Sequence, residues 1–159
     1  MKLKRLRPDA VLPTRATPGS AGYDLCAAID APLTLRPGER ILVPTGWAAD
    51  PGSEDCVLMI CARSGLALRN GIAMANGVGI VDSDYRGELR VPTINLSDVP
   101  YTLRPGERFA QLLVVPVRTP ELEVVEELEE TERGDGGFGH SGAFSPRLKA
   151  EENKTSGTQ

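Results

Sequence analysis

The segment 76–91 combines an acidic residue and an aromatic residue in a pattern that could do chemistry. Asp82 lies in a polar turn, Tyr85 follows three residues later, and apolar residues precede Asp82 and alternate again from Leu89. This pattern predicts a β-hairpin. A carboxylate held on a tight turn can activate a water molecule, and a ring beside it can hold a small planar ligand. An ordinary Asp-rich turn with a surface tyrosine is the alternative.

A second candidate is the Arg63-Ser64-Gly65 sequence that follows an apolar run. Leu66 to Arg69 favour a short helix, Ser64 is a suitable N-cap, and Gly71 is a suitable stop. An arginine beside a helix N-terminus could bind an anion. Simple capping next to a surface arginine explains the same residues, so both interpretations stay open here.

Two polar residues interrupt strand-like apolar runs. Asp24 lies in the run that ends at Ala28, and Gln111 lies within the run 109–115. Because a buried carboxylate without a partner is costly, we expect Asp24 to meet a partner, the hydration shell of a metal ion, or solvent. Bracing of the preceding turn is the alternative for Asp24, and a core or strand-bracing hydrogen bond is the alternative for Gln111.

The glycine-rich segment 133–142 contains one arginine, Arg133, and one aromatic residue, Phe138. Its glycine spacing resembles that of a phosphate-binding loop, but His140 stands where lysine belongs and no strand-to-helix context surrounds it. A mobile arm that closes over a charged, planar ligand fits the composition better. A flexible linker to the polar tail is the alternative.

Composition excludes several classes of protein. The 159 residues carry a net charge of −4 with 4% aromatics, which argues against a nucleic-acid partner. A single histidine excludes multi-histidine metal sites, and three cysteines without a CxxC motif indicate free thiols in a reducing compartment. No run is apolar enough to span a bilayer, and the basic first eight residues are not a signal peptide, so we expect a cytoplasmic protein without a membrane partner.

The chain around these candidates is predicted to form short strands and turns, because 17 glycines and 13 prolines are spread along it. We expect an edge strand over 2–6, a fully buried strand over 57–61 and a strand over 90–96. Pro92 places part of this last strand at an edge or bulge. A final strand is expected within 121–132.

An eight-residue sequence recurs almost unchanged at 33–40 and 101–108, each copy containing Thr-Leu-Arg-Pro-Gly-Glu-Arg. Two copies are too few for a repeat protein. They predict two equivalent hairpins of a β-sandwich or jelly roll.

Five separated motifs, taken together, resemble those of the homotrimeric deoxyuridine triphosphate nucleotidohydrolases (dUTPases). They are Ala21 to Leu25, Arg63 to Ala67, Asn76 to Gly87, Pro105 to Gln111 and Arg133 to Gly142, in the order of that family. The departures are an alanine, Ala62, where a proline often precedes Arg-Ser-Gly, and a longer tail beyond Phe144.

The resemblance implies an all-β, jelly-roll-like barrel or sandwich with one short helix. One domain would span 1–144, including the arm 133–142, and 145–159 would be a disordered tail. It also implies a homotrimer with shared active sites, in which the arm crosses a neighbouring subunit. One chain would supply Asp24, Arg63 to Gly65 and Gln111, a second the segment around Asp82, and a third the arm.

The resemblance also assigns roles to residues. Asp82 would deprotonate the attacking water, and Arg63, Ser64, Gly65 and Gln111 would hold the phosphates. Asp24 would hold Mg²⁺ through water. The nucleoside would contact Asn76, Ile80, Val81, Tyr85 and Phe138, with Arg133 on the terminal phosphates and Arg90 reaching the substrate.

The implied reaction is water attack on the α-phosphate of dUTP, which yields dUMP and pyrophosphate. It keeps uracil out of DNA and supplies dUMP for thymidylate synthesis. A single aligned water, a nearby base and several cationic donors suit such a reaction.

Two other functions are alternatives to dUTP hydrolysis. The dCTP deaminases share the fold, but their catalytic glutamate aligns with Pro92, which has no acid–base function, and a bifunctional enzyme is disfavoured for the same reason. A non-catalytic β-sandwich module would explain the strands. It would not explain Asp82 with Tyr85, Arg63 with Ser64 and the arm together.

Overall fold

The computed structural model describes residues 1–137, which divide into two units by their internal contacts. The first unit, Met1–Pro120, holds every strand and the helix of the described chain. The second begins at Glu121 and is considered by itself. The expected tail 145–159 lies outside the described residues, as does Phe138.

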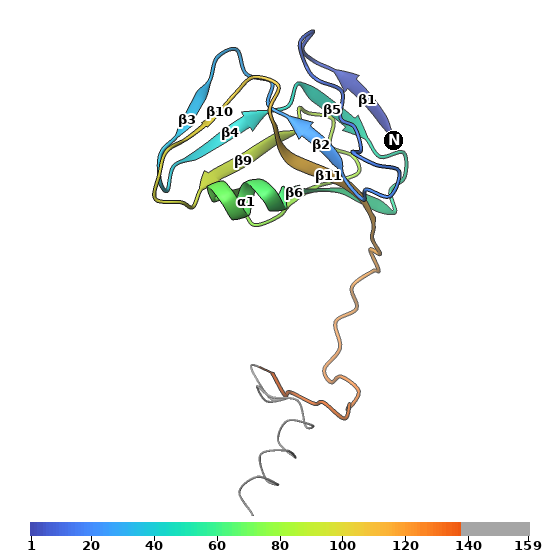
Figure 1. Cartoon of the computed structure of the whole chain (residues 1–159). Helices are drawn as coiled ribbons and strands as arrows, with labels where there is room; N and C mark the ends of the chain where they lie inside the picture. Colours follow the sequence, from blue (N-terminus) through green and yellow to red (C-terminus); the bar gives the residue numbers. More distant parts are fainter. Residues whose placement is uncertain (138–159) are drawn as a thin grey trace, which may run out of the picture. The chain divides into compact units, whose positions relative to one another are not determined.

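The first unit is built from short antiparallel strands with a single helix among the described residues, as expected (Figure 1). The elements are β1 (Lys2–Arg5), β2 (Tyr23–Cys26), β3 (Leu33–Leu35), β4 (Arg40–Pro44), β5 (Trp47–Asp50), β6 (Cys56–Ala62), α1 (Ser64–Asn70), β7 (Ile72–Met74), β8 (Gly79–Val81), β9 (Arg90–Asn95), β10 (Tyr101–Leu103) and β11 (Arg108–Pro116).

Two sheets carry most of these strands. The larger has the order β2-β11-β6-β8, the smaller has the order β4-β9-β7, and the pairs β1-β5 and β3-β10 complete the unit. Their apolar faces form one core that includes Leu25, Leu58, Ile60, Val91 and Leu112. The longest strand, β11, pairs with β2 on one side and β6 on the other, so it connects the elements that carry Asp24 and Arg63.

Strand β6 confirms the strand expected over 57–61 but not its complete burial. Cys56, Leu58 and Ile60 are buried, whereas the residues between them are half-buried. The strand therefore covers the core with one face only, because side chains alternate between the two faces of a sheet.

The segment 76–91 is not a β-hairpin. Strand β8 pairs with β6, whereas β9 pairs with β4 and β7, so the chain between them crosses from one sheet to the other. The expected polar turn is present, since the Tyr85 amide donates to the Asp82 carbonyl at 3.2 Å. The turn chemistry was therefore identified correctly, and the strand pairing was wrong.

The two copies of the repeated sequence are not equivalent hairpins either. Their first strands, β3 and β10, pair with each other (Figure 1). The Thr34 and Thr102 hydroxyls lie 3.0 Å apart. Each copy then makes a Pro-Gly turn whose glycine, Gly38 or Gly106, has φ +74°, as the type II turn requires. After the turns the copies diverge, because β4 joins the smaller sheet and β11 joins the larger one.

Pro92 lies in a central strand and not at an edge, because β9 is the middle strand of its sheet. It is opposite Leu42 of β4, and its carbonyl accepts a hydrogen bond from Ala75 at 2.7 Å. Ala75 directly follows Met74, the last residue of β7. The missing N–H of Pro92 therefore faces the end of a neighbouring strand, where the ladder stops.

Three further expectations have mixed outcomes. Strand β1 confirms the edge strand near the N-terminus, since it pairs with β5 alone. No strand forms within 121–132. Among the described residues, the helix α1 does not have the length and apolar character needed to cross a membrane.

Helix α1 ends as the sequence predicts but begins differently. Gly71 has φ +67°, and its amide bonds to the carbonyls of Ala67 and Leu66. Ser64 is the first helical residue, and the cap position belongs to Arg63, whose side chain makes no capping bond. The Ser64 side chain is therefore not used as a cap, contrary to the prediction.

Candidate active site

A polar pocket of about 660 Å³ brings together the first, second and fourth of the five motifs. Strand β2 supplies Asp24, the start of α1 supplies Arg63 to Gly65, and β11 supplies Gln111. Its other lining residues are Ala16, Ser20, Ala21, Gly22, Leu66, Arg69, Asn70, Tyr101, Glu107 and Arg108. We call this pocket the arginine pocket.

Asp24 is held between two arginines in the arginine pocket. Its Oδ1 lies 3.0 Å from Nε of Arg63, and its Oδ2 lies 3.0 Å from Nη1 of Arg108. The side chain of Asp24 is only 14% exposed. The expectation that this carboxylate needs a partner is confirmed, because two arginines pair with it.

The same contacts fix the direction of Arg63. Its Nη1 donates to the carbonyl of Arg108 at 3.0 Å, while Nε faces Asp24. Nη2 makes no hydrogen bond within residues 1–137, so its donors are free, and Arg63 lines the arginine pocket. Gln111 is anchored similarly, because its Nε2 donates to the carbonyl of Ala62 at 2.9 Å, which confirms the strand-bracing alternative for that amide.

Two arginines of the arginine pocket, Arg108 and Arg69, were not identified as site residues from the sequence. The sequence indicated only that Asp24 needed a partner, and the long-range pairing of β2 with β11 brings Arg108 to it. The signal for Arg69 was its spacing of four residues from Gly65, which places both on one side of a helix.

A second pocket of about 320 Å³ holds the acid and the ring of the third motif. It is lined by Leu42, Ile80, Val81, Asp82, Tyr85, Glu88, Leu89 and Arg90. Asp82 makes no side-chain hydrogen bond or ion pair with any residue from 1 to 137. Its carboxylate is therefore free to accept a proton from a water molecule. We call this pocket the carboxylate pocket.

The ring of Tyr85 is fixed against Gly87. A Cβ at Gly87 would lie 2.3 Å from the tyrosine hydroxyl oxygen, so only glycine leaves room for the ring. The hydroxyl donates to the carbonyl of Glu88 at 3.2 Å. Arg90 is held by the Glu88 carboxylate at 2.8 Å, and the other oxygen of that carboxylate accepts from the Gly46 amide.

The two pockets share no residue. Asp24, Arg63, Ser64, Gly65 and Gln111 lie in the arginine pocket, whereas Ile80, Val81, Asp82, Tyr85 and Arg90 lie in the carboxylate pocket. A single chain therefore brings the candidate residues together as two groups and not as one site.

Three further candidates are described separately. Asn76 is exposed in the turn before β8. Arg133 belongs to the second unit, where its Nε donates to the Gly136 carbonyl at 2.8 Å. Phe138 lies outside the described residues.

Burial changes the ionisation of two groups near Asp24. It raises the pKa of the Tyr101 hydroxyl, and the hydrogen bond to the Glu107 carboxylate raises that pKa further, so the hydroxyl stays protonated as a donor. Burial also raises the pKa of the Cys26 thiol. Cys26 therefore remains an unreactive core side chain.

The donor chemistry near Asp24 fits a magnesium ion held chiefly by water and phosphate. Within residues 1–137, no three histidine, cysteine or acidic side chains gather as a metal site. Mg²⁺ is commonly held by one or two carboxylates together with waters and substrate phosphates. Asp24 lies in a pocket lined by arginines, so it suits such an ion only when a polyphosphate is present.

Comparison with known proteins identifies the family. The family model for dUTPase matches residues 9–142. A deoxyuridine 5'-triphosphate nucleotidohydrolase of Photorhabdus laumondii is 49% identical over 138 residues, which cover 87% of this chain and 91% of that protein. The corresponding protein of Shewanella denitrificans is 52% identical over 131 residues, covering 82% and 86%.

Solved structures agree in fold. The dUTPase of Staphylococcus bacteriophage 80alpha with dUpNHpp aligns with a TM-score of 0.82 at 30% identity, covering 89% of this chain and 98% of that one. A dUTPase variant of S. aureus phage phi11, described with a structural Mg(II) ion, aligns with a TM-score of 0.72 at 26% identity, covering 81% and 98%. The chain therefore belongs to the dUTPase family, and the jelly-roll-like β fold is confirmed.

Proposed function

We propose that this protein hydrolyses dUTP to dUMP and pyrophosphate by attack of water on the α-phosphate. The observation that carries the proposal is the pairing of two chemically complementary pockets. One presents arginine donors suited to phosphates, and the other presents an unpaired carboxylate beside a fixed tyrosine ring. The family and the names of its relatives point to the same reaction.

In the carboxylate pocket, Asp82 orients the attacking water and takes its proton. The ring of Tyr85 packs on the deoxyribose, where a 2′-hydroxyl would collide with it. Ile80 and Val81 lie along the nucleoside, and Asn76 reads the uracil. Arg90 contacts the substrate while Glu88 holds its guanidinium.

In the arginine pocket, the free edge of Arg63, the Ser64 hydroxyl, the Gly65 backbone and the Gln111 side chain bind the phosphates. Negative charge develops on the phosphoryl oxygens during the reaction, and donors already held in place stabilise it without reorganising. The two ion pairs of Asp24 provide that order, because they fix Arg63 before the substrate arrives.

Mg²⁺ is the cofactor of this proposal, and Asp24 would hold it through water. When bound, it would supply positive charge that offsets the negative charge of the phosphates. Among the solved relatives, the phage phi11 enzyme is described with a structural Mg(II) ion. Asp24 also positions the two arginines that flank it.

The active form in this proposal is a homotrimer with shared sites. One chain contributes the arginine pocket, a second contributes the carboxylate pocket, and a third contributes the arm 133–142. Arg133 then meets the terminal phosphates, and Phe138 stacks on the base. The domain spans 1–144 with its arm, and the separation of the two pockets on one chain supports this arrangement.

The biological role that follows is to keep uracil out of DNA and to supply dUMP for thymidylate synthesis. We place the protein in the cytoplasm without a nucleic-acid or membrane partner. Its three cysteines are free, which fits a reducing compartment.

A side-by-side assay of dUTP and dCTP tests the function. We expect pyrophosphate release from dUTP alone, and no ammonia from dCTP, because Pro92 leaves no deaminase acid on β9. Ammonia release from dCTP would instead make the chain a deaminase. Absence of both products under Mg²⁺ would leave only a binding module, and the proposal would fail.

A further inference from the structure

We propose that Arg69 is a further substrate-binding residue, which contacts the phosphates beyond the α-phosphate and so favours a polyphosphate over a monophosphate. This inference rests on the proposed function. Arg69 lies in the last turn of α1 and lines the arginine pocket together with Arg63 and Arg108.

The side chain of Arg69 runs back along the helix over Gly65. A Cβ at Gly65 would lie 3.0 Å from Nη2 and 3.2 Å from Nη1 of Arg69, so the guanidinium packs against the bare glycine backbone. Helical side chains point toward the helix N-terminus, which explains this contact between residues four apart. The absence of a side chain at Gly65 thus lets the charge of Arg69 reach the pocket.

The charges of the pocket single out Arg69 among its three arginines. Arg63 and Arg108 share the carboxylate of Asp24. Glu107, the other acid of the lining, accepts hydrogen bonds from the Tyr101 hydroxyl and the Arg104 amide. Within residues 1–137, Arg69 makes no ion pair and no side-chain hydrogen bond.

Arg69 therefore carries the uncompensated positive charge of the pocket. All its donors are available to an anion, and bonds between guanidinium and phosphate are among the stronger hydrogen bonds of proteins. In the proposed function, Arg63, Ser64 and Gln111 supply donors from β11 and from the start of α1. Arg69 lies further along the helix, so it extends this set of donors. A longer phosphate chain uses this extension, and a monophosphate does not.

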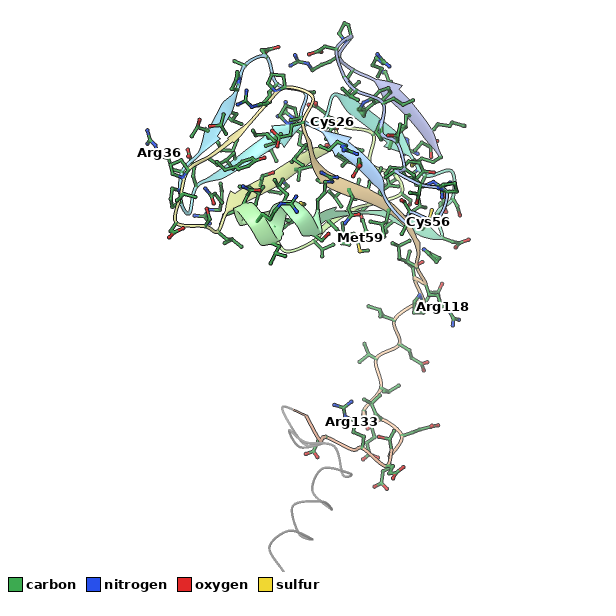
Figure 2. All side chains as sticks on the ribbon, in the orientation of Figure 1. Cys26, Arg36, Cys56, Met59, Arg118 and Arg133 are labelled. Carbon is green, nitrogen blue, oxygen red and sulfur yellow. The ribbon has the colours of Figure 1, made fainter. Side chains whose placement is uncertain are left out.

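The test compares Arg69→Ala and Arg69→Lys with Arg36→Ala, all in the full chain. Arg36 is the matched control, because it is an exposed arginine in the turn after β3, outside the arginine pocket, and its loss changes the net charge equally (Figure 2). Calorimetry measures binding of dUMP, inorganic pyrophosphate and dUpNHpp. Thermal melting followed by the fluorescence of Trp47, the one tryptophan, checks the fold.

We expect Arg69→Ala to lower the affinity for pyrophosphate and dUpNHpp at least about tenfold, the scale of one charged contact. The affinity for dUMP should fall by less than about twofold. Arg69→Lys should fall between, and Arg36→Ala should bind as the wild type does. An equal loss of affinity for dUMP and dUpNHpp, or no loss for either, would overturn the proposal. Wild-type protein that binds dUpNHpp without hydrolysing dUTP would refute the function alone, and wild-type protein that does not bind dUpNHpp would refute both.

Discussion

At the scale of single residues, the proposed hydrolysis depends on Asp82 as the base. Asp82→Asn keeps the size of the side chain and removes its ability to take a proton, so we expect kcat to fall at least ~10²-fold. Binding of dUpNHpp should stay nearly unchanged. Steady-state kinetics and calorimetry measure the two effects.

Asp84→Asn is the matched control for that variant, because Asp84 lies in the same turn but does not line the carboxylate pocket. It should retain wild-type turnover. If Asp82→Asn also turned over dUTP at a near-normal rate, another group would have to be the base.

Sugar selection should depend on the contact between Tyr85 and Gly87. Wild-type protein should prefer dUTP strongly over UTP, because a 2′-hydroxyl would collide with the Tyr85 ring, and also over dTTP. Gly87→Ala forces the ring to move, because the new Cβ would lie 2.3 Å from the hydroxyl oxygen. The preference for dUTP over UTP should therefore shrink, as measured by the ratio of kcat/KM values.

The control for this variant is Gly19→Ala, since no atom lies within 4 Å of the Cβ that it adds. Comparable kcat/KM for UTP and dUTP in the wild-type protein would contradict the role given to Tyr85.

Residue chemistry was the part that the sequence predicted best. Asp24 was expected to need a partner, because an unpaired buried carboxylate is costly, and it has two. Its partner Arg108 could not be identified in advance, since the pairing of β2 with β11 is a long-range contact. The type of a residue indicates which kind of partner it needs, but it does not indicate which strand supplies that partner.

At the scale of elements, the end of α1 is sharply defined. Gly71 adopts φ +67°, and a Cβ there would lie 2.5 Å from the Ser97 amide nitrogen. Gly71→Ala should therefore lower the unfolding free energy by more than the ~1 kcal/mol of a left-handed backbone alone. Denaturant unfolding followed by Trp47 fluorescence measures the loss, and Gly19→Ala again serves as the control.

Asn95 should be equally important for the loop after β9. The side chain is fully buried, donates to the carbonyls of Leu35 and Val99, and accepts from the amide and hydroxyl of Ser97. Asn95→Leu leaves these groups unpaired, so we expect a loss of about 3 kcal/mol in unfolding free energy. Asn70→Leu, at a half-buried position, should cost far less. A loss below ~1 kcal/mol for Asn95→Leu would mean that water replaces the amide.

Element type was easier to predict than element pairing. The apolar run of β6 and the Gly71 stop were visible locally, and both strand and helix end are present. The partners of β8 and β9 were not visible, because periodicity shows which face is buried and not which neighbour covers it. The final strand expected within 121–132 rested on apolar residues among glutamates, and Leu122, Val124 and Leu128 are almost fully exposed in the second unit.

At the scale of the whole molecule, the arm should act in catalysis and not in folding. The core lies within Met1–Pro120, so truncation after Thr131 should leave the melting transition unchanged without ligand. Activity should fall to a small fraction, because Arg133 and Phe138 are lost. Truncation after Phe144 is the control and should cost almost nothing, and full activity after the shorter truncation would refute the role of the arm.

The most direct test of the shared site uses two chains that are damaged in different pockets. Arg63→Ala removes a phosphate contact from the arginine pocket, and Asp82→Asn removes the base from the carboxylate pocket. Each variant alone should be nearly inactive. The two are unfolded, mixed in equal amounts and refolded together, and mixed oligomers are verified by mass.

If each site takes its two pockets from different chains, about one quarter of the sites in a random mixture combine two undamaged pockets. We therefore predict recovery to about one quarter of the wild-type rate of pyrophosphate release from dUTP, with no recovery when either variant is refolded alone. Verified mixed oligomers that remain as inactive as their parents would contradict the account, because both pockets would then have to come from one chain.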